Sequence, residues 1–258
     1  MAFEETKRQV AVGNRVLHHI GLTDGITLAL GHVSMRVPGE PDRFIVKGRG
    51  YAVDVLPVVR GEDMIVCDLD GAMVEGPPGG MPCFEVKIHS AIYKNHPEVN
   101  SVVHVHPRYT VLMSVLGVPL VPMCQEGANL VRTPVPMWSH TRLVVTDEDG
   151  EGLAHLIGDS PVAMLPGHGA VATGTSISRS IANVYALEEQ ARMNYLAVAA
   201  SGPDHPRISE ALLVEVDATP TVRDLPHFAS SLPPESGAVP DPGAGPYLYW
   251  SSLVEAGA

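Results

Sequence analysis

The chain has 258 residues, 45% of them apolar, and a formal net charge of −12 at pH 7. A chain of this length can bury one substantial core as a single domain. The acidic balance argues against a nucleic-acid surface, which requires a basic face, and no apolar run approaches the roughly 20 residues of a membrane span. Its three cysteines fit neither a disulfide scaffold nor a zinc knuckle. We therefore expect a soluble, cytoplasmic protein without nucleic-acid or membrane partners.

The first half of the chain mixes helical and strand-like patterns. Apolar residues at helical spacing predict a helix over residues 4–20, and a second, short helix is expected over 23–29. A helix over 84–95 is expected to end before Pro97. Alternating or continuous apolar runs bounded by Gly/Pro turns predict strands over 31–37, 43–47 and 64–68.

The second half continues the mixture and then changes in composition. Strands are predicted over 101–106, 118–123 and 161–165, and helices over 109–116 and 178–200. Residues 217–246 are rich in Pro, Gly, Ala and Ser, which predicts an irregular arm. We divide the chain into a catalytic domain, 1–215, and a C-terminal arm, 216–258. The aromatic end of the arm, 247–250, is expected to pack on its own core or near a neighbouring subunit's site.

Two histidines one residue apart carry most of the functional information. His104 and His106 lie at the end of an apolar segment that is predicted to be a strand. Alternate side chains of a strand point to the same face, so the two imidazoles converge. A single histidine is more often structural than a ligand, but a convergent pair on a rigid strand suits a metal ion.

Two further residues extend this pair into a possible metal site. His168 stands between glycines after a buried strand, and Glu85 lies near the start of the helix over 84–95. Three imidazoles leave coordination positions open, which is typical of catalytic rather than structural sites. Glu85 is either a fourth ligand or an acid/base group. Such a donor set suits Zn, Mn, Fe or Co, and the ion would stabilise negative charge that develops on a substrate oxygen.

The ordered motifs resemble the class II aldolase/adducin family over about residues 5–200. They are Gly31–Arg36, Glu85 on its helix, His104-Val105-His106 and Gly167-His168-Gly169. The resemblance implies one divalent ion per subunit, bound by His104, His106 and His168, with Glu85 as ligand and acid/base. It also implies a single-domain α/β (α+β) fold of three layers, with a central, mostly antiparallel sheet flanked by helices. Family enzymes are usually homotetramers with sites at subunit interfaces.

The chain departs from the sugar-phosphate aldolases of this family where they bind phosphate. His32 replaces an asparagine, Lys47 and Arg49 occupy the phosphate loop, and Phe84 replaces a serine before the glutamate. Phosphate-cradling hydroxyls are absent, which favours a flat or apolar carboxylate. Arg49 can grip a carboxylate bidentately with Lys47 as a point charge, although both could equally belong to a solvated loop.

The motifs are most similar to the decarboxylase-like branch of the family. We therefore predict a metal-dependent decarboxylase of an ortho-hydroxy aromatic or vinylogous keto acid, with Glu85 or His32 protonating carbon and Lys47, Arg49 and Phe84 contacting the substrate. The alternatives are an aldolase on a non-phosphorylated hydroxy-keto substrate, a non-haem iron oxygenase and a non-catalytic scaffold. His89 follows Glu85 by one helical turn, so we expect it either to orient that carboxylate or simply to pack.

Overall fold

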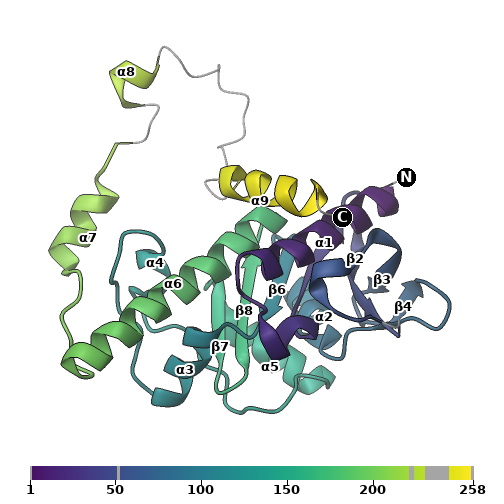
Figure 1. Ribbon diagram of the computed structural model, residues 1–258, viewed down its shortest axis with the longest axis horizontal. Helices are drawn as coiled ribbons and strands as arrows, with labels where there is room; N and C mark the ends of the chain where they lie inside the picture. The colour runs from purple at the N-terminus through teal and green to yellow at the C-terminus, as the bar shows by residue number, and fades with distance from the viewer. Residues whose placement is uncertain (1, 51–52, 221–223, 230–243, 257–258) are drawn as a thin grey trace.

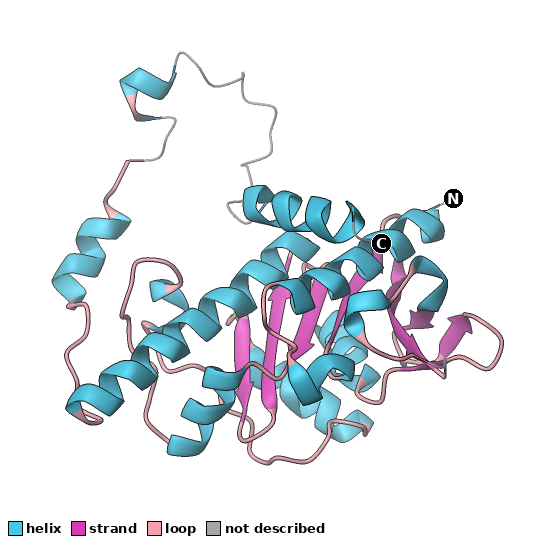
Figure 2. Cartoon of the chain, in the orientation of Figure 1, coloured by secondary structure: helices cyan, strands magenta, loops and turns pink. Residues whose placement is uncertain are grey.

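The computed structural model describes residues 2–50, 53–220, 224–229 and 244–256. Its centre is an antiparallel sheet with the strand order β4-β3-β2-β1-β6-β8-β7, and β5 pairs with β2 beside this path (Figure 2). The strands are β1 (His32–Val37), β2 (Glu40–Arg49), β3 (Met64–Asp68), β4 (Met73–Glu75), β5 (Met81–Pro82), β6 (Ser101–Val105), β7 (Val162–Leu165) and β8 (Gly169–Gly174). The expected antiparallel sheet is confirmed.

Helices cover both faces of the sheet and complete the expected three layers (Figure 1). The longer ones are α1 (Ala2–His19), α2 (Val86–Asn95), α3 (Arg108–Leu116), α5 (Asp147–Ile157), α6 (Ile177–Ser201) and α9 (Ala244–Ala256). The shorter ones are α4 (Ala128–Val131), α7 (Glu210–Asp217) and α8 (Pro226–Ala229). In the described part of the chain, none of the helices combines the length and apolar content needed to cross a membrane.

Strand alternation divides the apolar interior into two cores. Ile45 and Val103 belong to the core shared with α1 and α6, whereas their neighbours Phe44 and Val102 belong to the core shared with α2 and α5. Successive side chains of a strand point to opposite faces, so both faces of the sheet must be covered by helices. His104 has the same parity as Val102, and its side chain therefore points to the α2 side of the sheet.

The long helix α6 follows its sequence pattern closely. The Ser176 hydroxyl accepts a hydrogen bond from the Arg179 backbone N–H, which caps the helix. The predicted inner stripe, which includes Ile181, Val184 and Leu187, is fully buried against the sheet. The expected range of 178–200 differs from the observed one by a single residue at each end.

The strand predicted over 118–123 is wrong. These residues form no sheet ladder, because side chains of α6 take their backbone groups instead. The Asn194 amide accepts from the Val121 N–H at 3.0 Å and donates to the Val121 carbonyl at 2.8 Å. The Gln190 amide oxygen accepts from the Met123 N–H at 3.0 Å. A buried polar backbone needs partners, and here two helix amides supply them without a neighbouring strand.

The aromatic end of the C-terminal arm packs on the chain's own helices. Helix α9 lies across α1 and α6 (Figure 1), and the Trp250 ring lies 5.6 Å from the Tyr185 ring between centroids. Tyr247, Trp250 and Val254 contact the core shared by α1 and α6. The stretch from 230 to 243, part of the arm expected to be irregular, lies outside the described residues.

Removing the Trp250 side chain is expected to destabilise the fold. Trp250 is partly buried against Tyr185, so W250A should lower the free energy of unfolding by about 1–3 kcal/mol, less than for a fully buried tryptophan. The exposed neighbour Tyr249 provides the control, and Y249A should change stability by less than about 0.5 kcal/mol. Urea denaturation of the full chain measures both. Equal midpoints for W250A and Y249A would contradict this packing.

Candidate metal centre

Glu85 is placed by the start of helix α2. It is the N-cap residue, with φ −100° and ψ 35°, and its carbonyl accepts the first turn's bond from Ile88 N–H. Its carboxylate is buried, and Oε1 accepts a hydrogen bond of 2.9 Å from the Val144 backbone N–H. Burial alone would raise the pKa of Glu85, but its interactions with His104 and the hydrogen bond from the Val144 N–H hold it well below its ordinary value. Glu85 is therefore a carboxylate with one oxygen, Oε2, directed at the histidines.

His104 and His106 come from the end of β6, as strand alternation predicts. The His104 ring is fully buried, and its Nδ1 lies 3.1 Å from the Ala170 carbonyl oxygen, to which it donates in the neutral tautomer. That tautomer leaves the Nε2 lone pair facing the Glu85 side. His106 follows the strand, and burial lowers its pKa to about 3, so its imidazole is neutral and can also offer a lone pair.

His168 lies in the tight turn between β7 and β8. Gly167, with φ +64°, allows this turn, and the His168 N–H donates to the Leu165 carbonyl at 3.1 Å. A side chain at Gly169 has no room, because its Cβ would lie 2.4 Å from the Val105 carbonyl oxygen. The two glycines therefore bring the His168 ring against the end of β6, where it lies 4.7 Å from the His106 ring between centroids.

The structure brings Glu85, His104, His106 and His168 into one cluster. Glu85 Oε2 lies 3.2 Å from His104 Nε2 and 3.4 Å from His168 Nε2, and the Nε2 atoms of His104 and His106 are 3.1 Å apart. Donors that share one ion at about 2.0–2.1 Å are roughly 3.3 Å apart in a tetrahedral site. The observed spacing therefore fits a single divalent cation.

Unpaired nitrogen atoms give a second indication that these residues fit a metal ion. Both ring nitrogens of His168 are buried and make no hydrogen bond with any described residue, and the approach of Nε2 to Glu85 lacks hydrogen-bond geometry. Buried polar atoms nearly always have partners, so an orphaned imidazole calls for one. Three imidazoles and a carboxylate suit zinc and the neighbouring transition metals.

A pocket of about 520 Å³ reaches this cluster from the surface. His106 and His168 line this pocket together with Arg108, Tyr109 and Glu188. The Glu188 carboxylate has a structural role, because it accepts hydrogen bonds from the Tyr109 and Thr110 N–H groups and so caps α3. The candidate metal cluster is thus reached by a pocket on the side of His106 and His168, as a catalytic site requires.

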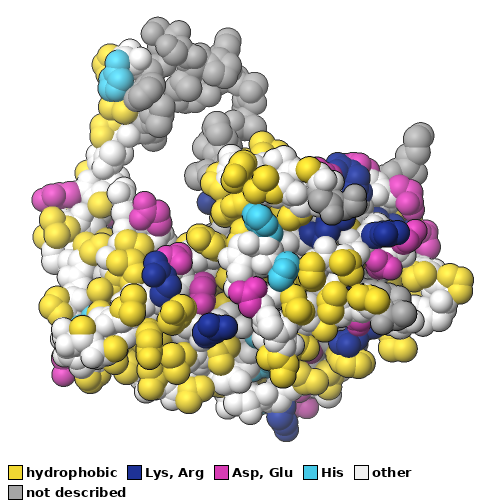
Figure 3. All heavy atoms as spheres, viewed as in Figure 1, with side chains coloured by type: hydrophobic (Ala, Val, Ile, Leu, Met, Phe, Trp, Pro, Cys, Tyr) yellow, Lys and Arg dark blue, Asp and Glu magenta, His cyan; other side chains and the backbone are white. Residues whose placement is uncertain are grey.

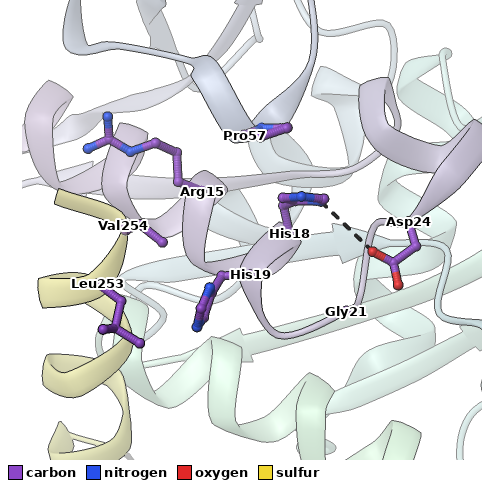
Figure 4. Close-up of a pocket in the computed structure, with 8 residues that line it drawn as sticks. All are labelled: Arg15, His18, His19, Gly21, Asp24, Pro57, Leu253 and Val254. Atoms are coloured by element: carbon purple, nitrogen blue, oxygen red, sulfur yellow. Dashed lines mark ion pairs between the residues drawn. The ribbon is translucent and has the colours of Figure 1, made fainter. Parts of the chain in front are cut away.

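A second hollow lies away from the cluster, between α1 and α9 (Figure 4). In that view His18 points toward Asp24, with Nδ1 3.9 Å from the carboxylate, while Leu253 and Val254 come from α9. None of the four clustered residues lines it. Asp24 is shared with the pocket above the metal cluster, so the two hollows are separated by the Gly21–Asp24 turn.

His32 borders the cluster from β1, next to β6. His32 and His104 are paired across the two strands, and their ring centroids are 5.4 Å apart. Burial, together with the positive potential of neighbouring groups, places the pKa of His32 well below its ordinary value. His89 hydrogen-bonds to His32 Nδ1 through its Nε2 at 2.7 Å, and not to Glu85. The predicted orienting contact between His89 and Glu85 is therefore wrong: one helical turn placed His89 against β1 instead.

Lys47 and Arg49 both form ion pairs with Asp54, a residue that the sequence did not indicate. Lys47 Nζ forms an ion pair with one carboxylate oxygen of Asp54, and Arg49 Nε lies 3.0 Å from the other. Lys47 is 1% exposed, so it is not the solvated loop residue that we considered as an alternative. The Arg49 guanidinium lies over the Phe84 ring at 4.3 Å from its centroid, and Phe84 is 59% exposed. The three predicted substrate contacts thus form one connected group, in which Asp54 joins Lys47 to Arg49 and Arg49 covers Phe84.

Comparison with known proteins identifies the family of this chain. The family model described as "Class II Aldolase and Adducin N-terminal domain" matches residues 8–195. The chain belongs to the class II aldolase and adducin family. It is 30% identical over 203 residues to a 3,4-dihydroxyphthalate decarboxylase of Arthrobacter keyseri, covering 76% of this chain and 80% of that protein. A protein of the same name from Rhodococcus jostii is 29% identical over 239 residues, covering 89% of this chain and 90% of the relative.

A solved structure confirms the class II aldolase fold. The aldolase II superfamily protein from Pseudomonas syringae matches with a TM-score of 0.79 at 21% identity, covering 100% of this chain and 94% of that one. This likeness establishes the shared class II aldolase architecture. Decarboxylases among the sequence relatives support lyase activity at the level of the family.

Proposed function

We propose that the chain is a divalent-metal-dependent decarboxylase of an ortho-hydroxy aromatic or vinylogous keto carboxylic acid. One observation carries the proposal: the cluster of three histidines and Glu85, with spacings of 3.1–3.4 Å, opens into a pocket. The relatives named as 3,4-dihydroxyphthalate decarboxylases support the reaction type. The fold alone would be compatible with several chemistries.

The proposed reaction replaces a carboxylate on carbon by a proton. The bond to the carboxylate carbon breaks, carbon dioxide leaves, and the electron pair moves toward the neighbouring oxygen. A divalent ion held by the histidines supplies the positive charge that stabilises this oxygen. Glu85 and His32 are the two chain residues placed to hold and move the proton. His104 and His106 keep their ligand orientation through the rigid end of β6.

We assign the outer carboxylate of the substrate to Lys47 and Arg49. The group already accommodates a carboxylate, that of Asp54, and the charges of the three residues sum to one positive charge. Phe84, exposed beside the Arg49 guanidinium, offers a flat apolar surface for a ring. This arrangement suits an anionic substrate that carries a planar ring.

Replacing Arg49 is expected to weaken substrate binding more than turnover. Loss of a charge-assisted contact is worth about 1.5–3 kcal/mol, so R49Q should raise KM about 10- to 100-fold with kcat changed less. Arg43 on the same strand is the control, because among the described residues its guanidinium bonds locally, to the Asp42 carbonyl. Steady-state kinetics of R49Q and R43Q measure the difference. A KM that is unchanged in R49Q would remove Arg49 from the substrate site.

The same proposal includes one divalent ion per chain, homotetrameric assembly and a cytoplasmic location. It also includes the division of the chain into a catalytic domain, 1–215, and an arm, 216–258.

Figure 3 shows hydrophobic side chains on the surface over α3, where Val115 and Leu116 are 67% and 46% exposed. Leu143 and Val145, beside the Glu85 partner Val144, are also exposed. Contiguous exposed apolar side chains are typical of an interface, and sedimentation analysis tests the assembly.

The direct test of the proposed function is carbon dioxide release from 3,4-dihydroxyphthalate. The protein is loaded in turn with Zn, Mn, Fe or Co, and products are identified under air and under anaerobic conditions. We expect a dihydroxybenzoate and carbon dioxide without oxygen uptake, and loss of activity on chelation. Inertness toward hydroxy-aromatic and keto acids, with cleavage of a sugar phosphate, would overturn the proposal. Oxygen-dependent turnover would favour an oxygenase.

A further inference from the structure

A buried chain of polar side chains leads away from His32 into the core between the sheet and α2. His32 Nδ1 lies 2.7 Å from His89 Nε2, and His89 Nδ1 lies 2.7 Å from Ser34 Oγ. The Ser34 hydroxyl in turn lies 2.7 Å from the Tyr93 hydroxyl. These four residues are at most 6% exposed, and His89 and Ser34 are completely buried. Water therefore does not compete for these contacts, and the direction of each hydrogen bond depends on its neighbours in the chain.

The direction follows from the Ser34 hydroxyl. With its single proton donated to the Val102 carbonyl, at 3.5 Å, its oxygen accepts from both of its neighbours in the chain. Burial raises the pKa of Tyr93, so the phenol keeps its proton and can donate it to the Ser34 oxygen at 2.7 Å. Burial lowers the pKa of His89 to about 3, so that ring is neutral and carries one proton. When His89 donates from Nδ1 to Ser34, its Nε2 can only accept from His32 Nδ1.

We propose that His89 is a positioning residue that holds His32 in the Nδ1–H tautomer, with the Nε2 lone pair left for the proton transfers of the reaction. The catalytic part of this inference rests on the proposed role of His32. In this arrangement His32 Nε2 accepts the proton of a substrate hydroxyl and, together with Glu85, returns it to the carbon that loses carbon dioxide. The opposite tautomer would present an N–H to the site and could not accept that proton.

A metal ion held by the same residues fits the geometry less well. Cys83 lies close enough to His32 and His89 for the three donor atoms to fall within 4.8 Å of one another. The two ring nitrogens are 2.7 Å apart, which is hydrogen-bond spacing and shorter than the roughly 3.3 Å of donors on one ion. The nearby positive charge of Lys47 also opposes a cation there. A hydrogen-bonded relay therefore describes this cluster better than a second metal centre.

The tautomer itself can be measured without any substrate. Long-range ¹H–¹⁵N correlation spectra of the zinc-loaded full chain, labelled at histidine nitrogens, distinguish Nδ1–H from Nε2–H imidazoles. We expect His32 as a single Nδ1–H tautomer in the wild type and as a mixture in H89F, which keeps an aromatic ring but removes both hydrogen bonds. S34A, which removes only the acceptor of His89, should shift the population in the same direction and serves if H89F does not fold.

The control is His96, at the other end of α2. Its Nε2 lies 2.9 Å from the Ala154 carbonyl oxygen, so H96Q removes a partly buried histidine contact far from His32. It should leave the His32 signals unchanged. An Nε2–H tautomer of His32 in the wild type, or an unchanged tautomer in both H89F and S34A, would overturn the inference.

Kinetics separate positioning from general loss of structure. H89F should lower kcat about 10- to 100-fold, the range expected when a general acid–base is misplaced, with KM and bound zinc nearly unchanged. In an H32N background the same change should have no further effect, because His89 acts through His32. Equal losses in both backgrounds would overturn the positioning role. If the wild type decarboxylates nothing, the proposed function fails while the tautomer measurement still decides this inference.

Discussion

Replacing His106 with alanine is expected to leave a folded protein that no longer retains its divalent ion and has lost its activity. His106 Nε2 lies 3.1 Å from His104 Nε2 and its ring faces that of His168, so its loss opens one side of the cluster. A bound metal ion stabilises the charge that develops in the transition state by several kcal/mol. Each ~1.4 kcal/mol of activation free energy is a factor of ten in rate. H106A should therefore be at least about 10³-fold slower.

Elemental analysis measures the metal bound to H106A, and thermal denaturation with and without added zinc measures how much the ion stabilises it. Neither measurement depends on activity. An ion that binds only the folded chain stabilises it by about 2.7 kcal/mol at one hundred times its dissociation constant. The wild type should gain stability with zinc, and H106A should gain little. The control is H155A, because His155 is exposed on α5 and bonds only to the Glu151 carbonyl within that helix. Full activity of H106A, or of the wild type after chelation, would contradict every enzymatic interpretation of this site.

The convergence of these histidines was predictable because it depends on local backbone geometry. Strand alternation brings His104 and His106 to one face, and the glycines on both sides of His168 indicate a tight turn. The start of helix α2 likewise placed Glu85 near its observed position. Each of these features is encoded within a few residues, and the family resemblance supplied their order along the chain.

Contacts that depend on distant segments could not be predicted in the same way. The Val144 N–H that holds Glu85 comes from a loop 59 residues away, with no pattern to mark it. Asp54 follows β2 after a short interval, but nothing in the sequence shows that it joins Lys47 and Arg49. Ser34 shares a strand face with His32, so alternation alone would have indicated that these two side chains lie together.

Secondary structure was missed where tertiary contacts override local pattern. Strand β8 is made largely of small residues, Gly169–Gly174, and lacks the β-branched run that marks a strand. It exists because it pairs on both sides, with β6 and β7. The apolar run at 118–123 forms no strand, because the side chains of Asn194 and Gln190 hydrogen-bond to its backbone groups. Local propensity describes this chain well only where no long-range partner competes for the backbone.

Replacing Glu85 with glutamine is expected to separate its role as ligand from its role in proton transfer. The amide oxygen can still accept from the Val144 N–H, as Oε1 does at 2.9 Å, so the loop and helix α2 should keep their positions. The negative charge beside His104 and His168 is lost, together with the ability to accept a proton at Oε2. E85Q should therefore fold normally and bind zinc more weakly.

The decisive comparison is made at zinc concentrations that saturate E85Q. A residue that acts only as a ligand would then be compensated, and kcat would return to within about tenfold of the wild type. A residue that also moves a proton would leave kcat about 10²- to 10⁴-fold lower, which is the result we expect. E85D keeps the charge on a shorter side chain and should recover part of the activity. Full activity of zinc-saturated E85Q would leave His32 as the group that transfers the proton, and Glu85 would then act through charge and coordination alone.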